Sequence, residues 1–253
     1  MSKILIWNVR IPELSGDDER RVYLYLPDSY TMDDTKKYPV MYMFDGHNVF
    51  FDSHATYGKS WGMQQYMDQA QKEWIIAAVE CNQKGNCRLE EYSPVDFVFS
   101  SVGKITGKGK VYMDWLTGTL KPYIDSHYRT LPDRENTIIC GSSMGGLMAL
   151  YGVCAYNQVF QRGACLSPSV WIAPEDILKI IETCDLLPDT CIYLDYGSEE
   201  LNHHENSANS LFRVSEYLLT RNVGMTLRII PGGTHCEASW QKQIPVFMEC
   251  LNG

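Results

Sequence analysis

The chain has 253 residues, of which 45% are apolar and 21% are charged, and its net charge is −9. This composition is typical of a globular protein, because a disordered chain contains fewer aromatic residues and more net charge per residue. The acidic balance also disfavours a nucleic-acid partner, since proteins that bind phosphate backbones carry a basic field.

Seven short apolar or β-branched segments alternate with longer helical patterns along the chain. They cover residues 21–26, 40–44, 74–79, 136–140, 162–166, 191–196 and 225–230. Several are apolar nearly throughout, as strands that are covered on both faces should be. This alternation predicts an α/β fold, with a mostly parallel twisted sheet and helices on both faces, in a single domain over residues 1–253.

Helices are predicted where apolar residues recur every three or four positions. Such stripes run from Trp115 to Ile124, from Ile177 to Ile181 and from Leu211 to Leu218. A last helix is expected over residues 239–251, where Pro245 would kink it or delay its start. Residues 81–110 fit neither helical nor strand spacing, so we expect a long excursion there.

Neither a signal peptide nor a membrane span is expected. The apolar run after Lys3 extends only from Ile4 to Trp7, which is too short for a signal-peptide core. The longest uncharged stretch, 136–161, is interrupted by glycines and therefore fits a strand, a turn and a buried helix. We therefore expect a cytoplasmic protein without a membrane partner.

The nine cysteines give no sign of a metal site. Their number is odd, no C-x-x-C pair occurs, and the spacing from Cys81 to Cys87 matches no zinc module. We interpret them as buried thiols in a reducing compartment.

A candidate nucleophile lies between a strand and a helix. Residues 141–145 read G-x-S-x-G, directly after an apolar strand and directly before a helix-forming run. A serine nucleophile needs a strained tight turn, where small neighbours let the chain reverse and expose the hydroxyl. Only Ser143 is framed by two glycines, because Ser142 would need a glycine where Cys140 stands. Ser143 is therefore the predicted nucleophile.

A serine hydroxyl is activated by a base that takes its proton, so a histidine is expected later in the chain. His235 follows the strand at 225–230 within a glycine-rich loop, which is where this order of elements places the base.

The acid that orients the base is expected near the end of the strand at 191–196. Glu200 completes a G-x-x-acid turn that begins at Gly197, whereas Glu205 lies at the start of a helical pattern and is an alternative. Asp195 and Glu199 are further candidates, although the side chain of Asp195, within the strand, is expected to point away.

Acyl transfer to such a serine also needs backbone amides that stabilise the oxyanion. The amide of Met144, directly after the nucleophile, and that of His47, in the turn after the strand at 40–44, are predicted for this role. Aromatic and basic residues in the loops are candidates for the substrate pocket: Arg88, Tyr92 and Trp171, with Tyr57 and Trp61.

Several segments together resemble one branch of the α/β-hydrolases. They are Met43–Phe50, Gly141–Leu147, Phe160 with Leu166–Trp171, and Gly233–His235 with Trp240. These segments are similar to the branch of esterase D, the feruloyl and acetylxylan esterases, the mycolyltransferases and the enterochelin esterases. The similarity is strongest to bacterial cytoplasmic hydrolases close to siderophore esterases, and it implies Ser143 as nucleophile and His235 as base.

The predicted function is two-step hydrolysis of a small-molecule ester, without a metal or an organic cofactor. A siderophore trilactone or an aryl or acyl ester is the expected substrate. The alternatives are acyl transfer by the same residues, a feruloyl, acetylxylan or general short-chain esterase, and a non-catalytic binding protein. The sequence predicts no particular oligomeric state.

Overall fold

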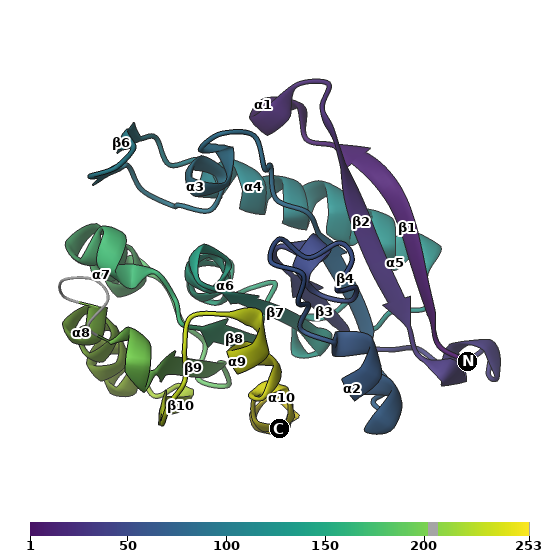
Figure 1. The fold of residues 1–253 in the computed structure, drawn as a ribbon. Helices are drawn as coiled ribbons and strands as arrows, with labels where there is room; N and C mark the ends of the chain where they lie inside the picture. The colour runs from purple at the N-terminus through teal and green to yellow at the C-terminus, as the bar shows by residue number, and fades with distance from the viewer. Residues whose placement is uncertain (202–206, 253) are drawn as a thin grey trace.

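One large sheet organises the computed structural model, which describes residues 1–201 and 207–252 (Figure 1). Within these residues, eight strands lie in the order β1-β2-β4-β3-β7-β8-β9-β10. They are β1 (Lys3–Arg10), β2 (Glu19–Leu26), β3 (Val40–Met43), β4 (Ile75–Val79), β7 (Thr137–Ser142), β8 (Arg162–Leu166), β9 (Cys191–Gly197) and β10 (Gly224–Ile230). In this order, each strand from β4 through β3, β7, β8 and β9 to β10 pairs in parallel with the next. β2 pairs antiparallel with both of its neighbours, β1 and β4. The predicted mostly parallel α/β fold is confirmed.

Helices cover both faces of this sheet (Figure 1). The α-helices of the described residues are α1 (Pro12–Ser15), α2 (Met63–Gln69), α3 (Cys87–Glu91), α4 (Gly109–Trp115), α5 (Lys121–His127), α6 (Met144–Ala155), α7 (Pro174–Thr183), α8 (Ser207–Thr220), α9 (Glu237–Gln241) and α10 (Ile244–Cys250). Successive residues of a strand point to opposite faces. In β3, Tyr42 therefore packs into the core under α4 to α8, and Met41 packs into the core under α2 and α10.

The last predicted helix is divided into two. α9 ends at Gln241 and α10 begins at Ile244, with Pro245 in its first turn. Proline has no N–H to donate and its ring clashes with the carbonyl four residues earlier, so one continuous helix is disfavoured. The predicted helix from Trp115 to Ile124 is likewise divided between α4 and α5, because a π-helical segment at Leu116–Leu120 joins these two helices.

The edge strand β1 was not predicted. It pairs with β2 over Lys3–Arg10, and its side chains are exposed or half-buried. An edge strand that covers little core needs no continuous apolar pattern, so the short run from Ile4 to Trp7 gave only a weak signal. Trp7 packs against Tyr123 and Tyr128 next to α5 and so ties the hairpin to the body of the molecule.

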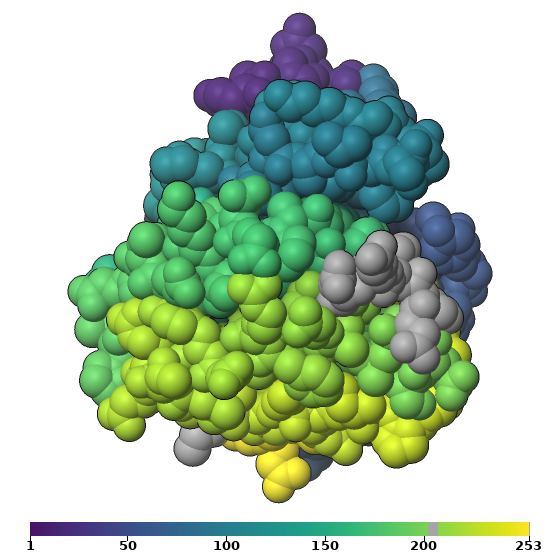
Figure 2. All heavy atoms as spheres, turned by 90° about the vertical axis from the view of Figure 1, so that its left-hand side faces the viewer, coloured from purple at the N-terminus to yellow at the C-terminus, as the bar shows by residue number. Residues whose placement is uncertain are grey.

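The excursion at 81–110 contains α3 and a small hairpin of β5 (Phe97–Phe99) and β6 (Gly103–Ile105). A buried ion pair anchors it, because Arg20 of β2 donates to both carboxylate oxygens of Glu91 at 2.9 Å. Figure 2 shows the excursion, in blue and teal, above α7 and α8 on one side of the molecule.

No described helix is long and apolar enough to cross a membrane. The uncharged stretch 136–161 instead forms β7, the turn at Ser143 and α6, as predicted. Of the cysteines, Cys81, Cys140, Cys154 and Cys165 are buried, whereas the other five are partly exposed. The prediction of buried thiols is therefore confirmed for these four and is wrong for the rest.

Candidate active site

The predicted site residues follow four of the parallel strands of the sheet. His47 comes after β3, Ser143 after β7, Glu200 after β9 and His235 after β10. The carboxyl ends of parallel strands lie at the same edge of a sheet, so this topology brings their loops together.

Ser143 occupies a strained turn between β7 and α6. Its φ is 59° and its ψ is −125°, a conformation that L-residues rarely adopt. The flanking glycines are required by space, because a Cβ at Gly141 would lie 2.4 Å from the carbonyl oxygen of Gly145. The Ser143 amide donates to the Leu166 carbonyl of β8 at 2.9 Å, which fixes the turn against the sheet.

His235 lies between Ser143 and Glu200. Its Nε2 is 2.9 Å from the Ser143 Oγ, and its Nδ1 is 2.5 Å from the Glu200 Oε2. Because Nδ1 faces a carboxylate, the neutral ring carries its proton there, and Nε2 then accepts the serine hydroxyl. The arrangement can move the serine proton to His235 while Glu200 stabilises the resulting imidazolium.

Glu200 ends the short 3₁₀ helix Ser198–Glu200 and is only 3% exposed. Its Oε1 accepts from the Ser167 hydroxyl at 2.6 Å and from the Gly197 amide at 2.8 Å. Burial alone would raise the pKa of Glu200, but the hydrogen bonds with His235, Ser167 and Gly197 outweigh burial and lower it. The carboxylate is therefore ionised at neutral pH.

The other acid candidates lie elsewhere. Asp195 is buried within β9, where it accepts from the Tyr193 hydroxyl at 2.9 Å and from the Ser167 amide at 3.3 Å. Burial raises the pKa of Asp195 to about 7. Glu199 is exposed, and Glu205 lies outside the described residues. Of the candidates that are described, Glu200 is the one hydrogen-bonded to His235.

The two predicted oxyanion amides lie in first turns of helical segments. Met144 is the first residue of α6, and His47 lies in the 3₁₀ turn Gly46–Asn48. Amides in a first turn have no carbonyl partner within their helix, so they are available to an anion. A Cβ at Gly46 would lie 2.8 Å from the backbone of Ala78, so glycine permits the close approach that was predicted.

Comparison with known proteins identifies the family of this chain. A family model described as "Putative esterase" matches residues 15–248. The chain belongs to this esterase family. It is therefore a carboxylic ester hydrolase with the α/β-hydrolase architecture.

Three known proteins are similar to this chain. The uncharacterized protein YbbA of Bacillus subtilis is 24% identical over 247 residues, which cover 92% of this chain and 93% of YbbA. An IroE-like serine hydrolase from Shewanella oneidensis is 19% identical with a TM-score of 0.75, covering 99% of this chain and 79% of that one. The enterobactin esterase FES from Shigella flexneri, solved in the presence of enterobactin, is 16% identical with a TM-score of 0.71. That alignment covers 100% of this chain and 58% of FES.

Two of the predicted pocket residues belong to the core of this esterase. Tyr92 is fully buried, and its hydroxyl accepts the Asp45 amide at 3.1 Å. Trp61 is 3% exposed and packs against Trp240 and Phe247. The prediction that they line the pocket is wrong. The sequence shows that these residues are aromatic, but it does not show whether their side chains point to the core or to the surface. Tyr57, in contrast, is 82% exposed.

The remaining pocket candidates lie nearer the surface. Trp171 is half-buried and packs against Phe99 of the excursion, with the two rings tilted and their centroids 6.0 Å apart. The Arg88 side chain is 30% exposed, and its Nε and one Nη each donate to the Asp45 carboxylate at 2.7 Å. Arg88 therefore also supports Asp45, which begins the turn that carries His47.

One buried cluster has the side-chain types of a metal site. Ligand atoms of Asp45, His47 and Cys81 lie within 4.8 Å of one another. Both Asp45 oxygens already accept from Arg88, whose positive charge opposes a second cation. Burial also raises the pKa of the Cys81 thiol far above its ordinary value, which disfavours the thiolate that a metal needs. The cluster therefore fits a metal poorly.

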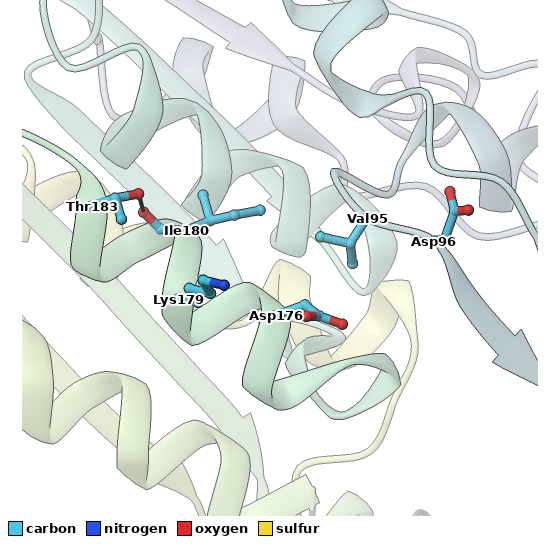
Figure 3. A pocket seen from close by; sticks show the side chains of 6 residues that line it. All are labelled: Val95, Asp96, Asp176, Lys179, Ile180 and Thr183. Carbon is cyan, nitrogen blue, oxygen red and sulfur yellow. Dashed lines mark hydrogen bonds between the residues drawn. The ribbon is translucent and has the colours of Figure 1, made fainter.

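The structure also contains a shallow groove away from these residues. It lies between α7 and the loop before β5, and its volume is about 450 Å³ (Figure 3). It is lined by Val95, Asp96, Asp176, Lys179, Ile180 and Thr183. Ser143, Glu200 and His235 are not among them, so we do not assign the ester to this groove.

Several residues that surround His235 and Glu200 were not predicted from the sequence to have a role. Ser167 donates to Glu200, and the Trp240 Nε1 donates to the Ser167 hydroxyl at 3.0 Å. Ser167 and Trp240 lie in segments that carry the family resemblance, but each is hydrogen-bonded to a residue far away in the sequence. Glu237, only two residues after His235, was not singled out at all.

Proposed function

We propose that Ser143, His235 and Glu200 act as a catalytic triad in ester hydrolysis. The observation that carries this proposal is the continuous contact from the Ser143 Oγ through His235 to Glu200. The strained turn at Ser143 supports it further, because that geometry exposes the hydroxyl.

In the first step, Ser143 Oγ attacks the ester carbonyl while His235 Nε2 takes the hydroxyl proton. The tetrahedral oxyanion accepts from the amides of Met144 and His47. His235 then gives its proton to the leaving alcohol, and the acyl group stays on Ser143. In the second step, His235 deprotonates a water molecule, which attacks the acyl-enzyme and releases the acid. The proton returns to Ser143, so no external reactant besides water is needed.

We propose a siderophore trilactone that carries three catecholate groups as the substrate, met inside the cell. Structures that share this fold include proteins named an enterobactin esterase and an enterobactin and salmochelin hydrolase. Trp171 and Arg88 offer an aromatic surface and a positive charge near the loops, which suit a catecholate.

A panel of acetyl, butyryl, feruloyl and tris-catecholate esters tests both parts of the proposal. We expect the highest kcat/KM on the trilactone and no activity in Ser143→Ala. Equal or better kcat/KM on acetyl and butyryl esters would favour a general short-chain esterase. Adding glycerol distinguishes hydrolysis from acyl transfer, because a transferase would form the glycerol ester.

A further inference from the structure

The loop of the base and the turn of the oxyanion amide are joined by one hydrogen bond between side chains. The Asn48 Nδ2 donates to the Glu237 Oε1 at 3.1 Å. Asn48 directly follows His47, and Glu237 is the second residue after His235. The bond therefore connects two parts of the site that are 189 residues apart in the chain.

Asn48 is held in place by further contacts within its own loop. Its Oδ1 accepts the Thr56 amide at 2.9 Å, and its carbonyl accepts the Trp61 amide at 2.8 Å. The Thr56 hydroxyl in turn bonds the His47 Nε2 at 3.0 Å. A displacement of Asn48 is therefore transmitted to His47, whose backbone amide is the predicted oxyanion donor.

Glu237 is equally restrained on the other side. It is the first residue of α9 and is 5% exposed. Three residues later in the same helix, Trp240 bonds Ser167, which donates to Glu200. Residues at positions i and i+3 lie on the same side of a helix. α9 thus contacts the oxyanion turn through Glu237 and the support of the acid through Trp240.

We propose that Glu237 and Asn48 are positioning residues that hold the His47 amide and the His235 ring at the separation that the transition state requires. This inference rests on the proposed triad. The pair does not react, so its effect is on kcat: base and oxyanion donor act together only in the transition state. A shift of about 1 Å between such groups can lower the rate by roughly 100-fold.

The charge around Glu237 gives the pair a recognisable response to pH. Burial, and then the Asp45 carboxylate, raise the pKa of Glu237, whereas His235 and Arg88 act in the opposite direction. In Asn48→Asp a second carboxyl faces Glu237 in place of the amide donor. Two carboxylates in contact repel each other and bind a shared proton as the pH falls. The defect of Asn48→Asp relative to wild type should therefore shrink at lower pH.

The decisive experiment reverses the hydrogen bond. In the double variant Asn48→Asp/Glu237→Gln, the glutamine amide can donate to the new aspartate across the same gap. We expect Glu237→Gln to keep kcat within about threefold, because the amide oxygen still accepts from Asn48. Glu237→Ala and Asn48→Asp should lower kcat by roughly 10- to 100-fold with KM changed by less than about threefold. The double variant should recover most of the loss.

Steady-state kinetics on a p-nitrophenyl ester at pH 6 and 8.5, with thermal midpoints for every variant, measure these effects. Glu249→Ala, which removes an exposed carboxylate from the neighbouring α10, is the control for charge alone and should leave kcat unchanged. If Glu237→Ala fails to fold, the comparison of kcat between Asn48→Asp and the double variant tests the inference.

Three results would overturn the inference: a native kcat in Glu237→Ala, a raised KM with unchanged kcat, or a double variant no better than Asn48→Asp. The second result would make Glu237 a substrate contact. Failure of the proposed triad is distinguished by Ser143→Ala, since activity in that variant would remove the triad itself.

Discussion

The turn at Ser143 and the two loops that carry Glu200 and His235 are held by different kinds of contact. Ser143 is fixed by backbone bonds, because its amide donates to Leu166 and its carbonyl accepts from Leu147 and Ser169. Glu200 and His235 are oriented mainly by side chains, with Ser167 bonded to the carboxylate and the Trp240 ring packed edge-on against the imidazole. Substitutions near the nucleophile should therefore spare its geometry, whereas substitutions near the acid and base should change theirs.

The largest expected effect is the loss of the nucleophile. Ser143→Ala removes one hydroxyl and no backbone contact, so the fold should persist while kcat falls by roughly 10⁶-fold. Ester hydrolysis together with a thermal midpoint measures both quantities. Ser142→Ala is the matched control on the neighbouring residue and should keep substantial activity. The opposite pattern would place the nucleophile at Ser142.

Removing the charge of the acid should have the next largest effect. Glu200→Gln keeps the shape of the side chain but no longer stabilises the imidazolium, so kcat should fall roughly 10²- to 10⁴-fold with little change in KM. The exposed Glu199→Gln should have near-native kinetics. A loss below about tenfold in Glu200→Gln would indicate a Ser143 and His235 dyad, or a role for Glu205.

Removing the side chains that support Glu200 should lower kcat by a smaller but measurable factor. Ser167→Ala removes a hydrogen bond to a charged group, which is worth about 1.5 kcal/mol and corresponds to roughly a tenfold loss of kcat. Trp240→Phe keeps an aromatic side chain but removes the indole N–H that holds Ser167, so its loss should be lower, about threefold. Native kcat in Ser167→Ala would mean that the Gly197 amide alone positions the acid.

The smallest effect on activity is expected for Asp195→Asn, which instead changes stability. The pKa of Asp195 is about 7 in the folded protein and 3.8 in its ordinary state, so the folded protein binds more protons between these values. The protonated carboxyl of Asp195 therefore makes its full contribution to the unfolding free energy below about pH 4, and this contribution is lost as the pH rises through 7. The loss approaches about 4 kcal/mol.

Urea unfolding between pH 5 and 8 tests this expectation. Asp195→Asn should flatten the dependence of unfolding free energy on pH and should be the more stable protein at pH 8, with kcat within about threefold of wild type. An unchanged slope would show that Asp195 is ionised in the folded state.

The sequence predicted the parts of the molecule that depend on local spacing. The strained turn around Ser143, the loop of His235 and the G-x-x-acid turn at Glu200 each have a local signature, and the structure brings these side chains together. Their catalytic roles remain predictions. The partners of these residues have no such signature, because Ser167 meets Glu200 only once β8 lies beside β9.

The wrong predictions have the same origin. Tyr92 and Trp61 are aromatic residues in irregular segments, where no periodicity shows which side faces the core. β1 was missed because an edge strand buries little surface. The hydrogen bond between Asn48 and Glu237 likewise depends on the tertiary fold, which places the loop after β3 beside α9.

The buried pair of Arg20 and Glu91 bears on how this esterase could be re-engineered. The excursion at 81–110 contributes Arg88 and the Phe99 ring against Trp171, which makes it a natural cassette to exchange between relatives. Glu91 leaves with that cassette, while Arg20 stays in β2 with its guanidinium almost fully buried. An unpaired buried charge costs about 3–5 kcal/mol, comparable to much of the stability of a domain. A graft that lacks a carboxylate at this point should therefore strongly destabilise the host unless position 20 is changed with it.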